Sequence, residues 1–168
     1  MTFERDAESP ACSNDGKFVY YIDYFGPDLE RIPAAGGQPE TVAKGVAGGV
    51  SLSPDNKRLA FIQPTEHKNT IVVQDIDGGS RISLSTIGVT RGAAWAPDGN
   101  ALILSKATGA AANLFYQPLD GSKPTQITHF DTEPMGIADY SFSPDGKQIA
   151  LTRGRVNDSD LVMFSNFR

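Results

Sequence analysis

Short apolar segments alternate with turns along the whole of this sequence. Apolar segments of four or five residues lie directly after a turn at residues 18–22, 59–62, 101–104 and 149–152. Runs this short, bounded by Pro, Gly, Asn and Asp, are typical of β-strands. A shorter strand is predicted before three of these turns, at 49–52, 93–95 and 139–142. The pattern therefore predicts an all-β chain built from hairpins.

The turn between these strands recurs four times. The copies read Ser13-Asn14-Asp15-Gly16-Lys17, Ser53-Pro54-Asp55-Asn56-Lys57, Ala96-Pro97-Asp98-Gly99-Asn100 and Ser143-Pro144-Asp145-Gly146-Lys147, with aspartates 40, 43 and 47 residues apart. Proline presets φ for a type I turn, and the aspartate can accept hydrogen bonds from nearby backbone N–H groups. The next residue must adopt a left-handed conformation, which glycine adopts freely and Asn56 tolerates.

Two further strands are predicted in the repeat. Third strands fall at residues 29–32, 70–74, 113–117 and 160–164, and three are followed by a Gly-containing turn and a fourth strand, at 40–42, 81–84 and 125–128. Four short antiparallel strands at a period of about forty residues predict the blades of a β-propeller. We expect one half-propeller domain over residues 1–168, with four blades at about 9–44, 48–86, 91–129 and 137–168.

The two ends of the repeat array are incomplete in complementary ways. The fourth copy stops in its third strand, whereas Thr2-Phe3-Glu4 stands where the outer strand of a preceding blade should lie. Residues 1–5 are therefore predicted to be an outer strand that closes the last blade. An open arc of blades exposes apolar faces at a cost on the order of 10 kcal/mol. We favour a homodimer that completes an eight-bladed ring over a four-bladed ring or additional upstream blades.

Composition and charge exclude several classes of partner. The net charge of −5 comes from interspersed acids and bases, without the basic stripe that nucleic-acid binding needs. The apolar runs are too short to cross a bilayer, and the N-terminus lacks the apolar core of a signal peptide. We expect no nucleic-acid partner and no membrane insertion by this chain. The single cysteine, Cys12, is predicted to be a buried thiol in an apolar strand.

No catalytic or metal-binding motif stands out. His67 lies in a polar loop and His129 ends a fourth strand, and neither is accompanied by a G-x-S-x-G, H-E-x-x-H or Cys–His pattern. The repeated aspartates Asp15, Asp55, Asp98 and Asp145 are explained by their own turns better than by calcium binding. We expect no enzymatic activity, no cofactor and no bound metal.

The repeated turns resemble those of a known family. The S-P-D-G-K turn, the apolar strand after it and the later D-G-G turn resemble the TolB-like propeller repeat, a relative of the WD-repeat blade, over essentially the whole chain. The last third, from Asn113-Leu114-Phe115-Tyr116-Gln117 through Leu151-Thr152-Arg153-Gly154 to Ser165-Asn166-Phe167-Arg168, is similar to the C-terminal propellers of acidobacterial serine/threonine kinases and winged-helix regulators. That resemblance implies a sensory or interaction module on the periplasmic side of a membrane-anchored parent.

The loops that join one blade to the next provide the candidate binding site. They are expected at one mouth of the central channel, where a rigid scaffold can present them to a ligand. In the longest loop, predicted at 130–139, Asp131, Glu133 and Asp139 are candidate contacts for a cation or polar ligand. Arg91 is a candidate anion contact, and Asp6 and Glu8 of the first loop are further candidate ligand contacts.

Three functions agree with these observations. The first is a non-enzymatic sensory or protein-interaction propeller that presents the channel mouth to a partner or small ligand. The second is a TolB-like periplasmic protein of an envelope complex. The third is the propeller part of a prolyl-oligopeptidase-type peptidase, which controls access to a hydrolase domain.

Overall fold

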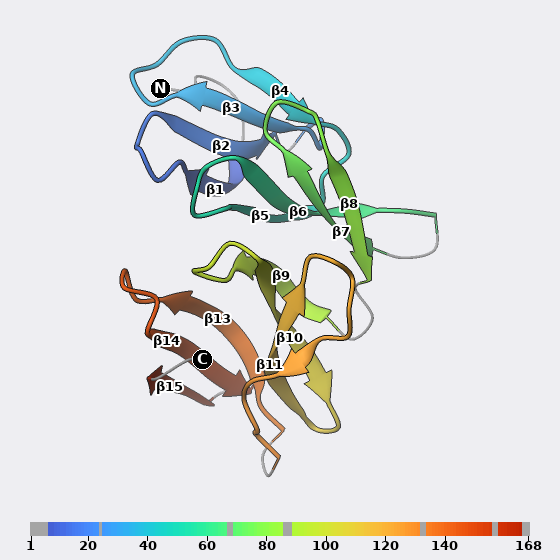
Figure 1. Ribbon diagram of the computed structural model, residues 1–168, viewed down its shortest axis with the longest axis vertical. Helices are drawn as coiled ribbons and strands as arrows, with labels where there is room; N and C mark the ends of the chain where they lie inside the picture. Colours follow the sequence, from blue (N-terminus) through green and yellow to red (C-terminus); the bar gives the residue numbers. More distant parts are fainter. Residues whose placement is uncertain are drawn as a thin grey trace. The chain divides into compact units, whose positions relative to one another are not determined.

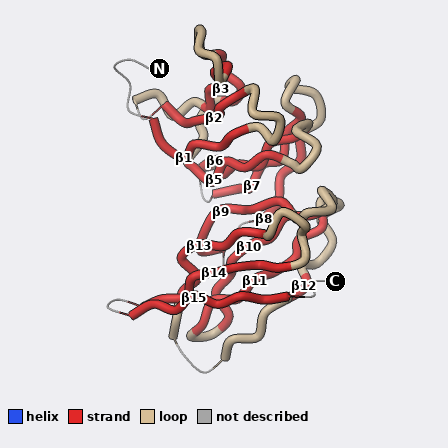
Figure 2. Tube along the Cα trace, turned by 90° about the vertical axis from the view of Figure 1, so that its left-hand side faces the viewer, coloured by secondary structure: helices blue, strands red, loops and turns tan. Residues whose placement is uncertain are grey.

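The computed structural model describes residues 7–23, 25–66, 69–85, 89–131, 134–155 and 158–165. Every regular element in these ranges is a β-strand, as Figures 1 and 2 show. Within them there is accordingly no helix long and apolar enough to span a membrane. The strands form four antiparallel sheets, two in each of two compact units, Met1–Thr86 and Ile87–Arg168. The predicted all-β class, with four propeller blades, is confirmed.

The first unit holds two four-stranded blades. The strands of the first are β1 (Ala7–Cys12), β2 (Phe18–Asp23), β3 (Leu29–Pro33) and β4 (Glu40–Ala43), and those of the second are β5 (Gly48–Leu52), β6 (Arg58–Pro64), β7 (Asn69–Asp75) and β8 (Arg81–Ser85). In each sheet a strand pairs only with its neighbours in the sequence (Figure 1). Each blade is therefore an antiparallel meander, as expected when successive strands are joined by hairpin turns.

The second unit holds one four-stranded sheet and one three-stranded sheet. Their strands are β9 (Val89–Trp95), β10 (Ala101–Thr108), β11 (Ala111–Pro118) and β12 (Thr125–Gln126), followed by β13 (Gly136–Phe142), β14 (Gln148–Arg155) and β15 (Asp158–Ser165). The last sheet has the order β13-β14-β15. Among the described residues, this blade lacks a fourth strand. The closing strand predicted at residues 1–5 lies outside the described residues.

The core of the first unit forms where its two sheets face each other. Tyr20 and Ile22 of β2 and Leu29 of β3 pack with Leu59 and Phe61 of β6, all almost fully buried. Alternate residues of a strand point to opposite faces of a sheet, so this set is the inward half of each apolar run. The intervening residues Tyr21 of β2 and Ala60 of β6 are also buried, which shows that the runs supply both faces of a blade.

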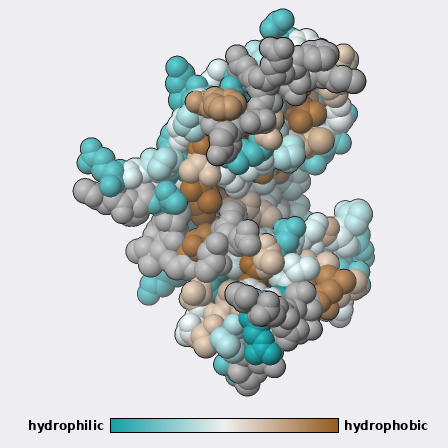
Figure 3. Space-filling model, turned by 180° about the vertical axis from the view of Figure 1, so that it is seen from behind, coloured by the Kyte–Doolittle hydropathy of each residue, from teal (hydrophilic) through white to brown (hydrophobic). Residues whose placement is uncertain are grey.

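The second unit repeats this arrangement. Ile103 of β10 and Leu114 of β11 pack with Ile137, Ile149 and Leu151 of the last sheet. Some apolar surface stays exposed: Phe25, Leu161 and Met163 are the large hydrophobic side chains with the greatest exposure among the described residues. Figure 3 shows hydrophobic surface, coloured brown, on both units.

Several strand boundaries differ from those predicted. β10 and β11 pair as far as Thr108 and Ala111, although the small and polar residues there carry no apolar run. β12 stops at Gln126 instead of residue 128, because the Leu114 N–H bonds the Thr128 hydroxyl in place of a backbone carbonyl (2.9 Å). β13 begins at Gly136, so Asp139 belongs to a strand and not to the loop predicted at 130–139.

The prediction that Cys12 is buried is wrong, because its thiol is exposed. Its neighbour Ala11 packs against the core of the first unit. Since successive side chains of a strand point to opposite faces, Cys12 projects from the other face of the first blade.

Candidate functional site

The repeated turns are built by hydrogen bonds within each copy. The Ser13 hydroxyl donates to the Asp15 carboxylate (2.7 Å) and accepts the Phe18 N–H (2.9 Å), and the same carboxylate accepts the Lys17 N–H (3.1 Å). The copies that begin at Ser53 and Ser143 repeat all three bonds. These bonds favour the ionised carboxylate, so they lower the pKa of Asp15 to about 2 and also lower the pKa of Asp55 and Asp145.

The loop between β12 and β13 is anchored by one buried amide. Asn113 of β11 donates from its Nδ2 to the Phe130 carbonyl (3.0 Å) and accepts the Phe130 N–H at its Oδ1 (2.7 Å). The same Oδ1 accepts the hydroxyl of buried Thr128 (3.0 Å). A buried network in which each polar group is paired holds its backbone in one conformation. The start of the loop is therefore rigid.

Aromatic packing and a backbone bond hold the rest of the described loop. The Phe130 ring meets the Phe164 ring edge-on, with centroids 5.8 Å apart, and the Arg153 guanidinium lies 3.7 Å from the Phe130 centroid. At the other end of the loop, the carbonyl of buried Met135 accepts the Ala112 N–H (3.0 Å). The loop is thus fixed at both ends, while its His129 and Asp131 side chains are exposed.

The predicted mouth residues are only partly described. Asp131 is an exposed residue of this loop, and Glu8 is an exposed residue of β1 in the first unit. Asp139 is exposed on β13 and lines a shallow hollow of about 150 Å³ beside Leu161. Asp6, Glu133, the Arg91 side chain and His67 lie outside the described residues. In the described ranges, no three His, Cys, Asp or Glu side chains gather where they could hold a metal ion.

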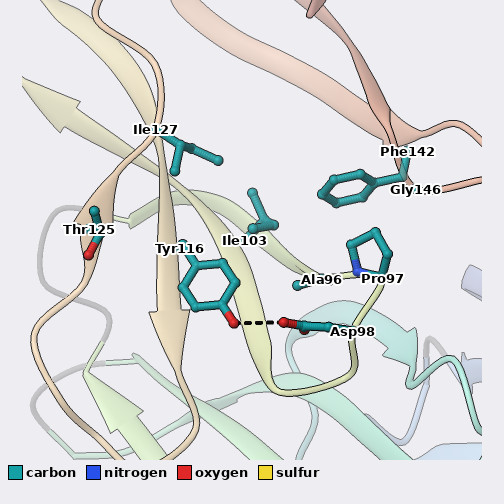
Figure 4. Close-up of a pocket in the computed structure, with 9 residues that line it drawn as sticks. All are labelled: Ala96, Pro97, Asp98, Ile103, Tyr116, Thr125, Ile127, Phe142 and Gly146. Atoms are coloured by element: carbon teal, nitrogen blue, oxygen red, sulfur yellow. Dashed lines mark hydrogen bonds between the residues drawn. The ribbon is translucent and has the colours of Figure 1, made fainter. Parts of the chain in front are cut away.

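A second site was missed by the sequence analysis. A pocket of about 390 Å³ lies in the second unit between the turn before β10, strand β11 and the turn before β14 (Figure 4). Phe142 and Pro97 face Ile103 and Tyr116 across it, and the Tyr116 hydroxyl donates to the Asp98 carboxylate (2.9 Å). Its lining residues are Ala96, Pro97, Asp98, Ile103, Tyr116, Thr125, Ile127, Phe142 and Gly146.

The sequence signal for this pocket is a departure from the repeat. The third copy of the turn has Ala96 where the other copies have serine and Asn100 where they have lysine. Asp98 still accepts the N–H two residues on, from Asn100 (2.9 Å), but it has no serine hydroxyl to bind. Its second oxygen bonds Tyr116 instead. The sequence explains Asp98 by its own turn and the other lining residues by the predicted turns and strands, so it does not indicate a pocket.

Comparison with known proteins identifies the scaffold. Residues 36–164, most of the chain, match the sequence profile of PD40, the TolB beta propeller domain. The chain belongs to the TolB β-propeller family.

This TolB-type propeller covers only part of each protein to which it is similar. It is 24% identical over 112 residues to the TolB homolog of Chlorobaculum tepidum, which covers 67% of the chain and 24% of that protein. It is 30% identical over 113 residues to dipeptidyl-peptidase 5 of Porphyromonas endodontalis, covering 62% of the chain and 16% of that protein. TolB from Acinetobacter baumannii superposes with a TM-score of 0.81 at 22% identity, covering 96% of the chain and 41% of that structure. The chain thus spans less than half the length of each.

Proposed function

We propose that this TolB-family propeller is a non-enzymatic sensory or protein-interaction module that presents the β12–β13 loop to a protein partner. The proposal rests on the two hydrogen bonds between the buried Asn113 side chain and the Phe130 backbone. They fix a loop whose His129 and Asp131 side chains are exposed. A loop held rigid on a β scaffold loses little conformational entropy when it binds, which favours recognition. A place in a signalling protein is part of this proposal, because the last third of the sequence resembles the propellers of kinases and winged-helix regulators.

Site-specific photo-crosslinking in the native cell tests this proposal. A photoreactive amino acid in place of Asp131 should give one discrete protein adduct. The same group at position 120, in the exposed Asp120 turn of the same unit, is the matched control. Adducts of equal yield at both positions, or none at 131, would contradict the proposal. Loss of the position-131 adduct in an Asn113→Ala background would link the contact to the anchored loop.

Two alternatives are supported by particular similarities. The matches to TolB of Chlorobaculum tepidum and Acinetobacter baumannii favour a protein of a periplasmic envelope complex. The match to dipeptidyl-peptidase 5 favours the propeller of a prolyl-oligopeptidase-type peptidase. The coding sequence on both sides of this chain distinguishes them. A kinase or winged-helix domain upstream supports the leading proposal, whereas a G-x-S-x-G hydrolase domain downstream supports the peptidase.

Self-association is the second part of the proposal. In the last sheet, Leu161 pairs with Thr152 and Met163 pairs with Ala150, so both side chains project from one face of β15. They are 73% and 64% exposed. A blade face with such residues is normally covered by the next blade. We propose that a second copy of the chain covers it and completes an eight-bladed ring.

A further inference from the structure

The pocket beside Asp98 carries a negative charge on an apolar wall. Asp98 is exposed, and among the described residues no basic side chain forms an ion pair with it. By contrast, Asp15 in the first copy of the turn pairs with Lys17 (3.2 Å). Asn100 takes the place of that lysine in the third copy. The Tyr116 hydroxyl holds one Asp98 oxygen at the edge of the pocket, as Figure 4 shows.

The first unit shows what occupies the equivalent place there. Tyr20 lies seven residues after Ser13, as Ile103 lies seven residues after Ala96. Arg31 pairs with Tyr20 as Tyr116 pairs with Ile103. The neighbours on the fourth strands, Glu40 and Thr125, correspond in the same way. The position of Tyr116 in the second unit is therefore that of Arg31 in the first.

Arg31 fills its site as an ion pair stacked on an aromatic ring. Its Nε and Nη2 both donate to Glu40 (3.0 and 2.8 Å), and its guanidinium lies 5.1 Å from the Phe18 ring centroid. In the second unit the guanidinium is replaced by the Tyr116 phenol, Tyr20 by the smaller Ile103 and Glu40 by Thr125. Beside Tyr116, which stands at the position of Arg31, lies a cavity with an aromatic wall and a carboxylate.

We propose that this pocket binds an arginine side chain of a partner polypeptide. The guanidinium pairs with Asp98 and stacks against Phe142 or Tyr116, while its aliphatic stem lies on Ile103 and Ile127. A planar guanidinium is suited to both contacts, because it forms paired hydrogen bonds with a carboxylate and stacks on aromatic rings. A volume of about 390 Å³ is within the range of small-molecule sites and accommodates a single side chain.

The pocket and the loop of the proposed function share Ile127, which directly follows β12. The pocket lining includes neither His129 nor Asp131, whose exposed side chains carry the proposed function. The inference therefore goes beyond that function. Each can fail without the other.

NMR titration of the whole chain with a short peptide tests the pocket. The probe is acetyl-Gly-Arg-Gly-amide, and the matched control is the same peptide with citrulline, which keeps the shape of arginine and removes its charge. We expect the arginine peptide to shift the amides of Asp98, Gly99 and Gly146 with a Kd on the order of 1 mM. At equal concentration, we expect shifts at least about threefold smaller with the citrulline peptide, because the ion pair is lost.

Three variants assign the effect to Asp98. Asp98→Asn should weaken binding about threefold or more, whereas Asp120→Asn, the same charge change outside the pocket, should not. The double variant Ala96→Ser with Asn100→Lys restores the turn of the other copies, so it preserves the fold and gives Asp98 partners of its own. It should also weaken binding.

The outcomes separate the proposal from non-specific attraction. Shifts confined to the pocket, and reduced by both Asp98→Asn and the double variant, support it. No shift at about 20 mM peptide, equal shifts with citrulline, or unchanged binding by the double variant would overturn it. A lysine peptide that binds as tightly as the arginine peptide would overturn the assignment of a planar guanidinium.

Discussion

Pro97 packs directly on Gly146 in the second unit. A Cβ atom at position 146 would lie 2.7 Å from Pro97 Cβ and 3.0 Å from its Cγ. The corresponding turns of the first unit also meet, but through hydrogen bonds: the Asn14 N–H donates to Asn56 Oδ1 (2.7 Å), and Asn14 Nδ2 donates to the Pro54 carbonyl (3.0 Å). Successive turns thus touch in both units, and the kind of contact depends on the residue at the left-handed position. Asn56 accepts a hydrogen bond from Asn14, whereas Gly146 leaves room for the Pro97 ring.

The Gly146→Ala variant should be destabilised for two reasons. Its φ of +68° is a left-handed conformation that costs a residue with a Cβ about 1–2 kcal/mol. The contact with Pro97 adds a clash between two rigid groups, which costs about 1–2 kcal/mol more. Urea unfolding followed by circular dichroism gives the total.

Gly121→Ala is the matched control for Gly146→Ala. Gly121 is in the same unit with φ of +80°, and nothing lies within 4 Å of its Cβ position. It should show the backbone cost alone. In addition, Pro97→Ala should recover part of the loss in the Gly146→Ala background. Equal losses at Gly146 and Gly121 would show that the Pro97 contact does not contribute.

Replacement of Asn113 by alanine should loosen the β12–β13 loop. It leaves the Phe130 N–H and carbonyl and the Thr128 hydroxyl without their partner, at a cost of about 2–3 kcal/mol. Amide hydrogen exchange should accelerate at Phe130 and at Ala112, whose N–H bonds the Met135 carbonyl.

Gln117→Ala provides the comparison on the same strand. The Gln117 amide donates to the carbonyls of Pro118 and Ser122, at the opposite end of β11. Its loss should accelerate exchange around residues 119–122 and leave Phe130 protected. If both variants accelerate exchange over the whole unit, Asn113 is a general stability residue and not the anchor of the loop.

The blades were predictable from the repeat, because the geometry of each turn is determined by the residues within that turn. The Ser13–Asp15 bond and the left-handed Asn56 follow from residues that are adjacent in sequence. The end of β12 did not follow in this way, because Thr128 is recognised as a side-chain partner only when Asn113 is known to lie beside it. Strand ends that depend on a buried polar pair are set by tertiary contacts.

The candidate site was predicted less well than the fold. Asp131 was found because exposed loop residues carry function, but Asn113 was read only as part of a strand. The pocket beside Asp98 depends on contacts between two blades, which a search within single repeats does not reveal. Aligning Arg31 with Tyr116 before the structure was known would have pointed to it.

Acid should lower the free energy of unfolding, because the turn aspartates become protonated. The pKa of Asp15 falls from its ordinary value of 3.8 to about 2, first because of the Ser13 hydroxyl and then because of the Lys17 N–H. A carboxylate with a depressed pKa in the folded state contributes stability that is present above pH 4 and is lost as the pH falls towards 2. Asp55, Asp120 and Asp145 are shifted in the same direction.

The Asp15→Asn variant tests this linkage. The difference in unfolding free energy between wild type and variant should be constant above pH 5 and shrink between pH 4 and pH 2. Ser13→Ala should raise the pKa of Asp15 towards its ordinary value in a carboxyl NMR titration, because it removes the largest cause of the shift. A difference that does not change with pH would show that Asp15 is equally acidic in the unfolded chain.

Self-association should depend on the exposed face of β15. Light scattering should give twice the 18.0 kDa mass of the chain for the wild type, and the monomer mass for the Leu161→Glu/Met163→Glu variant. Both residues are on one face of an edge strand, so two carboxylates there oppose any apolar contact with a second blade. Lys123→Glu, an exposed change in a turn of the same unit, should leave the dimer intact. A wild type that stays monomeric while it unfolds cooperatively contradicts closure by a second copy, since the two end faces would then be stable without cover.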